Sequence, residues 1–417
     1  MASSRTAFPE KGLGCAEIEP LMSEMAGGDE AWREGRVPLY VFKATDDAYN
    51  VGRDAFFKFF GENALGGKRA FHSIGRMERE VVDMALDLFG APAGAGGGMT
   101  TGGTESIFLA VRACREWARG AKGRKGPFNI VAAESAHPAF DKAGDTMDIP
   151  VKRVPLLDDF RADPAGIEAA IDDDTMMIVG SAPCFPHGVI DRIGDLGVVA
   201  TRAGVWLHVD ACVGGYLAPF VKRLGRDIPD FDFAVPGVRS LSADLHKFGF
   251  APKPSSTVLY RSEEDFRRQI FDLDPWTYGR MTTSTLVGTR PAGGIAGAWA
   301  VFRHLGADGY TEVARALMEM TDAYVAGIEA IPGLKMHAKP DLSIINFGSD
   351  DVDIFRVAEH MAAAGWVPGL TQRPMGMHAM LSMLHAPARE NYLKDLAEAV
   401  TVVRNGDGRA PELEARY

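Results

Sequence analysis

The sequence has few cysteines, no long uninterrupted apolar run and no excess of positive charge. The four cysteines in 417 residues are widely spaced and lack a paired metal-ligand pattern, which indicates a reducing, cytoplasmic setting and no metal site. A formal net charge of −11 provides no attraction to nucleic acid or to an anionic membrane. Residues 1–20 contain no signal-peptide or membrane-spanning stretch, so we expect no transmembrane segment.

The length of the chain and its 46% hydrophobic content allow a large core divided between domains. We predict an N-terminal arm over residues 1–54, a large domain over 55–305 and a small C-terminal α+β domain over 306–417. Between Phe128 and Tyr260, short β-branched runs alternate with helical runs, which predicts a mostly parallel, doubly wound α/β sheet. The glycine-rich segment 93–98 shows neither a helical nor a strand pattern and is predicted to be a loop.

One stretch, Ser242–Lys253, places Lys247 directly after His246, between an apolar run and a β-branched run. A lysine held by packed elements can lose its proton and form a Schiff base, although a lysine on a solvated turn would look the same. Asp210 ends the apolar run that begins at Val205. Ligands of open α/β sheets bind beyond the carboxyl ends of the strands, so Asp210 is placed at a site mouth unless it only caps a turn.

Glycines and hydroxyl groups precede a helical run in Gly102-Gly103-Thr104. Open backbone N–H groups at a helix N-terminus bind phosphate, whereas Thr104 could instead serve only as an N-cap. His137 follows a strand-like run and offers a flat imidazole for stacking on a ring; the alternative is a structural histidine.

Six motifs resemble, in sequence and in order, those of the sphingosine-1-phosphate lyases, which belong with the group II pyridoxal-phosphate decarboxylase-like enzymes. The resemblance extends over about Ala55 to Leu396. It implies an aminotransferase-type (fold type I) enzyme dependent on pyridoxal 5'-phosphate (PLP). The motifs are Thr101–Ser106, Ser135–His137, Pro186–Asp191, His208–Gly215, Ser242–Lys253 and Gly288–Gly294.

The resemblance implies a role for each matching residue. Lys247 forms the Schiff base with PLP, Asp210 keeps the pyridine ring protonated, and His137 stacks on that ring. It also implies a homodimer with shared active sites, in which the arm wraps the partner and a hydroxyl-rich loop reaches the neighbouring site. The expected cofactor-phosphate and cross-subunit contacts are Gly102, Gly103, Thr104, His246, Gly288 and Thr289.

The implied reaction is retro-aldol cleavage of a β-hydroxy amine, phosphorylated in the family, to an aldehyde and a small amine. A PLP-dependent amino-acid decarboxylase is the alternative, and an aminotransferase or a cofactor-binding protein without catalysis would share the fold. The predicted substrate contacts are Asn63, Lys253, Ser284 and Arg373; Lys253 and Arg373 could instead be surface residues.

Two departures from the family pattern concern the substrate phosphate. Gly66 stands where the lyases have a phosphate-binding histidine, and Phe42 aligns approximately with a tyrosine of the arm. We therefore expect poorer cleavage of sphingosine 1-phosphate unless Lys68, Arg69 or His72 replaces the lost donors.

Overall fold

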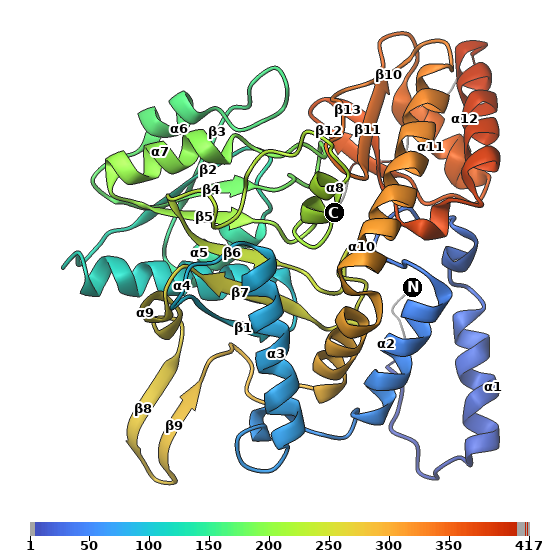
Figure 1. Cartoon of the computed structure of the whole chain (residues 1–417). Coiled ribbons are helices and arrows are strands. Elements are labelled where there is room, and N and C mark those ends of the chain that lie inside the picture. Colours follow the sequence, from blue (N-terminus) through green and yellow to red (C-terminus); the bar gives the residue numbers. More distant parts are fainter. Residues whose placement is uncertain (1–4, 407–412, 414, 416–417) are drawn as a thin grey trace.

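A seven-stranded sheet lies at the centre of the larger part of the molecule (Figure 1). The computed structural model of the chain describes residues 5–406, 413 and 415. The strand order is β1-β7-β6-β5-β4-β2-β3; β7 is antiparallel to both of its neighbours, and the remaining pairs are parallel. The strands are β1 (Gly96–Thr100), β2 (Asn129–Ala133), β3 (Val151–Val154), β4 (Thr175–Ser181), β5 (Trp206–Asp210), β6 (Val238–Ala243) and β7 (Ser256–Tyr260).

The β-branched runs in the sequence form β2, β3, β4, β5 and β7, as predicted. The predicted loop over 93–98 is wrong in part, because Gly96–Gly98 belong to β1 and pair with β7. A Cβ atom on Gly97 would lie 2.6 Å from Cδ2 of Leu259 and 2.9 Å from the Val258 carbonyl oxygen. The strand therefore needs glycine for close backbone approach, and glycine carries no strand signal in the sequence.

Helices cover both faces of this sheet and divide its apolar residues into two clusters. On one face α4 packs across β6 and β7, and on the other α7 packs against β4 and β5. Alternation along β5 sends Trp206 to the α4 face and Leu207 to the α7 face. The helices before the small domain are α3 (His72–Leu88), α4 (Gly103–Gly120), α5 (Ala139–Met147), α6 (Pro164–Ala170), α7 (Ile193–Ala203), α8 (Ala218–Arg223) and α9 (Glu263–Arg267).

A long helix, α10 (Ala292–Glu329), leads from the large sheet to a second, four-stranded antiparallel sheet of order β10-β11-β13-β12 (Figure 1). The helix is interrupted at Gly306, whose φ of 55° and ψ of −176° are not helical, beside the predicted domain boundary. The other elements here are β10 (Leu334–Met336), β11 (Ile344–Ser349), α11 (Ile354–Ala363), β12 (Gly369–Gln372), β13 (Met375–Met380), η3 (Met383–His385) and α12 (Arg389–Arg404).

The N-terminal segment contains α1 (Cys15–Ala26), η1 (Trp32–Glu34), α2 (Asp46–Lys58) and η2 (Ala64–Gly66), so α2 continues across the predicted end of the arm at residue 54. Between η1 and α2 the chain follows the small domain: the N–H groups of Val367 and Met380 donate to the carbonyls of Arg36 and Pro38 at 3.0 and 2.8 Å. Over residues 5–406, 413 and 415, no helix has the length and apolar character needed to cross a membrane.

A hairpin of β8 (Phe271–Trp276) and β9 (Gly279–Thr283) projects away from the large sheet (Figure 1). The sequence suggested only a hydroxyl- and glycine-rich segment here. Alternate residues of the hairpin show no buried face, and that absence of an apolar period explains why the strands were not predicted.

Candidate active site

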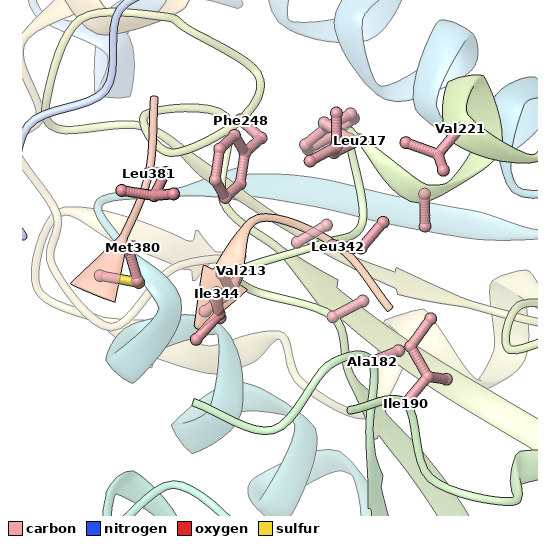
Figure 2. Packing of buried hydrophobic residues seen from close by; sticks show 14 of the residues in the cluster. Ala182, Ile190, Val213, Leu217, Val221, Phe248, Leu342, Ile344, Met380 and Leu381 are labelled. Carbon is pink, nitrogen blue, oxygen red and sulfur yellow. The ribbon is translucent and has the colours of Figure 1, made fainter. Parts of the chain in front are cut away.

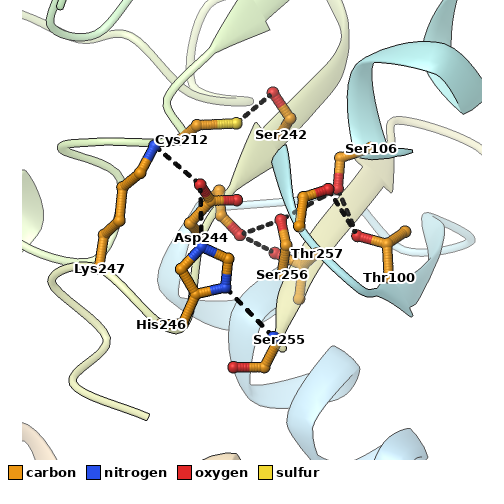
Figure 3. A network of polar contacts seen from close by, with 12 residues as sticks. Thr100, Ser106, Cys212, Ser242, Asp244, His246, Lys247, Ser255, Ser256 and Thr257 are labelled. Atoms are coloured by element: carbon orange, nitrogen blue, oxygen red, sulfur yellow. Dashed lines mark hydrogen bonds and ion pairs between the residues drawn. The ribbon is translucent and has the colours of Figure 1, made fainter. Parts of the chain in front are cut away.

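Lys247 lies on a tight turn between β6 and β7, and its ammonium group points at a buried carboxylate (Figure 3). Lys247 Nζ is 2.9 Å from Asp244 Oδ2, and the Asp244 side chain is only 2% exposed. The next residue, Phe248, fixes the turn by packing its ring among apolar side chains that include Leu217 and Leu381 (Figure 2). The turn is thus held by a buried ion pair on one side and by the hydrophobic core on the other.

Asp244 is a site residue to which sequence reasoning gave no role, although it stands three positions before the lysine. Burial favours the neutral amine of Lys247, but the charge of Asp244 outweighs it and raises the pKa of Lys247. Burial would raise the pKa of Asp244, but the charge of Lys247 and, to a smaller extent, the interaction with His246 lower it below its ordinary value. The pair is therefore ionised, with its charges neutralising each other inside the protein.

His246 closes this group from the other side (Figure 3). Its Nδ1 accepts a hydrogen bond from the Ser255 N–H at 3.2 Å, and its Nε2 lies 3.6 Å from Asp244 Oδ2. Burial lowers the pKa of His246 although Asp244 opposes that effect. The neutral ring consequently carries its proton on Nε2, where it can donate to an anion.

Asp210 ends β5 at the carboxyl edge of the sheet, as the sequence predicted. Its Oδ1 accepts the Cys212 N–H at 3.0 Å, and the residue is 8% exposed. His137 follows β2 and its Nδ1 accepts the Ala139 N–H at 3.1 Å. Burial lowers the pKa of His137, while the charges of Asp210 and Asp244 act to raise it, so the three groups lie within electrostatic reach of one another.

The N-terminus of α4 lies where the sequence predicted a phosphate-binding helix start. Gly102 is the N-cap and supplies no side-chain cap, so the alternative in which Thr104 is the N-cap is wrong. Glu105 does not fill the opening because its carboxylate accepts the N–H groups of Thr101 and Leu286 at 2.7 and 2.8 Å. A Cβ atom on Gly103 would lie 2.7 Å from Cys212 Sγ and 3.0 Å from both Asp244 carboxylate oxygens.

These groups match the functional groups of PLP in number and in kind. The cofactor needs an amine for its aldehyde, a carboxylate for its ring nitrogen and N–H donors for its phosphate. Lys247, Asp210 and the N-terminus of α4 with His246 could supply those groups, and at Gly103 the backbone comes close to Cys212 and Asp244, where a Cβ atom has no room. In the described part of the chain no cluster of His, Cys, Asp or Glu side chains is arranged to hold a metal ion.

Another set of predicted residues gathers elsewhere, at the start of α10. Asn63 Nδ2 donates to Thr289 Oγ1 at 3.2 Å, beside Gly288. Arg290 Nη1 donates to Glu78 Oε1 at 3.0 Å and to the Met99 carbonyl at 3.3 Å. None of the hydrogen bonds or ion pairs found among the described residues joins this set to Lys247 within one chain.

The remaining substrate candidates are separated from one another. Lys253 is exposed near the site mouth, where partial burial of its ammonium group and the charge of Lys247 lower its pKa. Arg373 is exposed on the turn between β12 and β13. Ser284 follows β9, and its carbonyl accepts Gln269 Nε2 at 2.5 Å. The structure therefore brings only Lys253 toward the lysine.

The match to known proteins agrees with this geometry. The pyridoxal-dependent decarboxylase conserved domain matches residues 71–349. A sphingosine-1-phosphate lyase of Oryza sativa subsp. japonica is 41% identical over 412 residues, 97% of this chain and 76% of the relative. The chain belongs to the sphingosine-1-phosphate lyase family of pyridoxal-dependent enzymes. It is a PLP-dependent lyase with the predicted fold.

Two further relatives of this lyase are informative. The solved sphingosine-1-phosphate lyase of Burkholderia pseudomallei has a TM-score of 0.92 at 35% identity, with 97% of this chain and 94% of that chain covered. The L-aspartate decarboxylase of Thermococcus kodakarensis is 33% identical, with 94% of this chain and 98% of the relative covered. The chain thus resembles enzymes named for cleavage of different bonds.

The departures from the lyase pattern have local structural consequences. The Phe42 ring lies edge-on to Phe248, with centroids 4.9 Å apart, so it packs on the lysine turn and offers no hydroxyl group. A Cβ atom on Gly66 would lie 3.0 Å from the Phe71 ring. The basic residues after η2 that could replace the lost donors are all exposed, namely Lys68, Arg69 and, at the first position of α3, His72.

Proposed function

We propose that this lyase cleaves the Cα–Cβ bond of a β-hydroxy amine phosphate, giving an aldehyde and a small phosphorylated amine. The observation that carries the proposal is the convergence of Lys247, Asp210 and His137 on the open N-terminus of α4. Relatives named as sphingosine-1-phosphate lyases support the substrate class.

When bound, PLP supplies an electron sink for the bond broken at the substrate's α-carbon. Lys247 is the amine for covalent attachment, and Asp210 holds a proton on the ring nitrogen. His137 offers a flat, neutral ring face. Gly103, Thr104 and His246 bind the cofactor phosphate through N–H groups.

Lys253 is the cation that we assign to the substrate phosphate. It is exposed, on the same turn as Lys247, and close enough for the Lys247 charge to lower its pKa. Phosphate binding needs charged or hydrogen-bonding partners, and Phe42 and Gly66 provide neither. Lys253 therefore contributes a larger share of phosphate affinity here than in a site with more donors.

Decarboxylation is the second candidate, favoured by the similarity to the L-aspartate decarboxylase. An assay of the purified enzyme distinguishes carbon–carbon cleavage from decarboxylation. The enzyme is incubated with sphingosine 1-phosphate, a short-chain β-hydroxy amine phosphate or L-aspartate, and the release of aldehyde and of carbon dioxide is measured. We expect aldehyde from the phosphates, with kcat/KM reduced about 10-fold or more in Lys253→Ala. Carbon dioxide from L-aspartate without any aldehyde would reject the proposal.

We also propose a cytoplasmic homodimer with shared active sites. The cysteines are free, which fits a reducing compartment. Large apolar side chains are exposed on α1, the β8–β9 hairpin and the loop that follows, an arrangement typical of an interface. Those side chains are Leu21, Met22, Met25, Trp276, Tyr278, Leu286 and Val287. Since Gly288 and Thr289 have no link to their own Lys247, a partner's site is the natural place for their function.

A further inference from the structure

A line of buried polar side chains runs along β5 and β6 and ends at Asp210. Trp206, His208 and Asp210 alternate along β5 toward the α4 face, and β6 places Ser240 beside His208 and Ser242 beside Asp210. Trp206, His208, Ser240 and Ser242 are all 0% exposed. Polar groups at this depth must satisfy one another, so the direction of each hydrogen bond can be worked out.

The direction of these hydrogen bonds is set by the indole of Trp206, at the end of the line that is farthest from Asp210. Trp206 Nε1 can only donate, and it donates to Ser240 Oγ at 2.7 Å. Among the described contacts the Ser240 hydroxyl has no acceptor other than His208 Nδ1, which lies 2.7 Å from it, so a buried hydroxyl hydrogen is satisfied only if Ser240 donates to Nδ1. Nδ1 is therefore the acceptor, and His208 carries its proton on Nε2.

Burial keeps His208 in this neutral form. It lowers the pKa of His208 to about 4, against the opposing influence of the Asp210 charge. A neutral imidazole with Nδ1 accepting must donate from Nε2, and the atom at 3.2 Å from Nε2 is Ser242 Oγ. The edge of the Phe140 ring, 5.7 Å away between centroids, provides no competing polar partner.

Ser242 donates the last hydrogen bond of the line, to Asp210. Its oxygen accepts from His208 Nε2 and from Cys212 Sγ, both at 3.2 Å (Figure 3 shows the cysteine contact). With both acceptor positions used, its hydroxyl hydrogen is left to donate, and Asp210 Oδ1 lies 3.5 Å away. Every hydrogen in the line thus points toward the carboxylate.

We propose that the side chains of Trp206, Ser240, His208 and Ser242 form a one-directional relay that fixes the His208 tautomer and orients the Asp210 carboxylate. The relay deepens the proposed function and rests on the assignment of Asp210 to the cofactor's ring nitrogen. His208 and Ser242 are positioning residues because they act through Asp210. A donor directed at a carboxylate oxygen limits the rotation of the carboxylate, and holding a proton on the ring nitrogen requires a carboxylate of fixed orientation.

The tautomer is testable without any activity measurement. In the full chain labelled with ¹⁵N-histidine, the ring nitrogens of His208, assigned by comparison with His208→Gln, should show Nε2 protonated and Nδ1 unprotonated at pH 7. Ser242→Ala should shift the ring toward the Nδ1-protonated form, because Nε2 loses its acceptor. An Nδ1-protonated ring in the unchanged protein would overturn the relay whatever the enzyme's reaction is.

The effect on Asp210 is tested by the pH titration of the visible absorbance of the bound cofactor and by its affinity. Ser242→Ala and His208→Leu should move the titration and weaken cofactor binding about 10-fold, the scale for one hydrogen bond to a charged group. His208→Gln, which can accept from Ser240 and donate to Ser242, should restore much of the loss.

Thr257→Val is the matched control. Thr257 is a buried hydroxyl residue of the adjacent strand that bonds to Tyr216 and to the Ala243 carbonyl, outside the line to Asp210. Equal effects of Thr257→Val and Ser242→Ala would reduce the relay to ordinary packing and reject it. An intact relay in a protein that releases no aldehyde would instead reject only the proposed function.

Discussion

At the scale of single residues, the most informative contact is the ion pair of Lys247 with Asp244. A buried ammonium group is not a nucleophile until it loses its proton, and Asp244 stabilises the protonated form. The same carboxylate lies beside Gly103, so cofactor entry must change its surroundings. Asp244 thereby links the protonation of Lys247 to the binding of the cofactor.

Replacing Asp244 by Asn tests this link. The loss of the negative charge should lower the pKa of Lys247, because burial is then opposed only by weaker interactions such as that with Asp210. We expect the pH profile for the rate of PLP attachment to the cofactor-free protein, followed by visible absorbance, to shift to lower pH. Lys253→Ala is the control, since that lysine makes no ion pair with Asp244 among the described contacts. An unchanged profile in Asp244→Asn would show that the ion pair does not control the amine.

At the scale of elements, we expect the N-terminus of α4 to bind the cofactor phosphate because it carries glycine at a position where a side chain has no room. We predict that Gly103→Ala weakens PLP binding by about 10-fold or more, since the added Cβ would lie 2.7 Å from Cys212 Sγ. Gly102→Ala is the matched control, because its Cβ would meet only His246 Cε1, at 3.5 Å. Equilibrium titration of the cofactor-free variants measures the difference, and equal affinities would contradict a steric requirement for Gly103.

Loops of the large sheet meet the small sheet at a group of three histidines, His187, His337 and His378. His187 stacks on Phe160 with ring centroids 4.6 Å apart, and His378 donates to the Phe185 carbonyl at 2.8 Å. Burial, with the charges of His337 and His378, lowers the pKa of His187 to about 4, and burial lowers that of His378 to about 4. Both rings are therefore neutral in the folded protein at neutral pH.

This contact predicts a pH dependence of stability. Between pH 4 and 6.5 the unfolded chain binds more protons at His187 than the folded protein, so the free energy of unfolding rises with pH, by up to about 3 kcal/mol for this group. His187→Gln removes the titration of this group and should make the rise smaller, while the contribution of His378 remains. Denaturant unfolding of both proteins at pH 5 and 7 measures it, and identical pH dependences would contradict the assignment.

At the scale of the whole molecule, the proposed dimer predicts complementation between subunits. Lys247→Ala removes the amine of a subunit's own site, whereas Gly288→Trp is designed to block the partner's site that the loop reaches. An added Cβ atom at Gly288 would have Leu65 Cδ2 as its nearest neighbour, at 3.8 Å, so the backbone there accepts a side chain. Mixed subunits should form hybrids with one intact site and regain up to about a quarter of the unchanged activity, because half of the dimers are hybrids with one site of two.

The controls for this experiment are the thermal unfolding of each variant and mass measurement of subunit exchange. Hybrids that form yet stay inactive would show that the loop serves its own chain. A purified protein that is monomeric and active would reject the dimer.

The sequence by itself determined the β-branched strands, the end of β5 at Asp210, the glycine-rich start of α4 and the position of Lys247. These are local properties, because strand alternation, helix periodicity and motif spacing depend on neighbouring residues. The membership of the family follows from the same motifs, and the comparisons confirm it.

Only the tertiary structure decided which distant groups meet. Residues of β6 and β5 had to pair before Ser242 could lie beside Asp210, and a turn had to close before Asp244 could face Lys247. The same folding left Arg373 exposed on a hairpin of the small sheet and made the glycines of β1 a strand. Contacts between residues far apart in the chain depend on backbone pairing and packing, which no local pattern of side chains specifies.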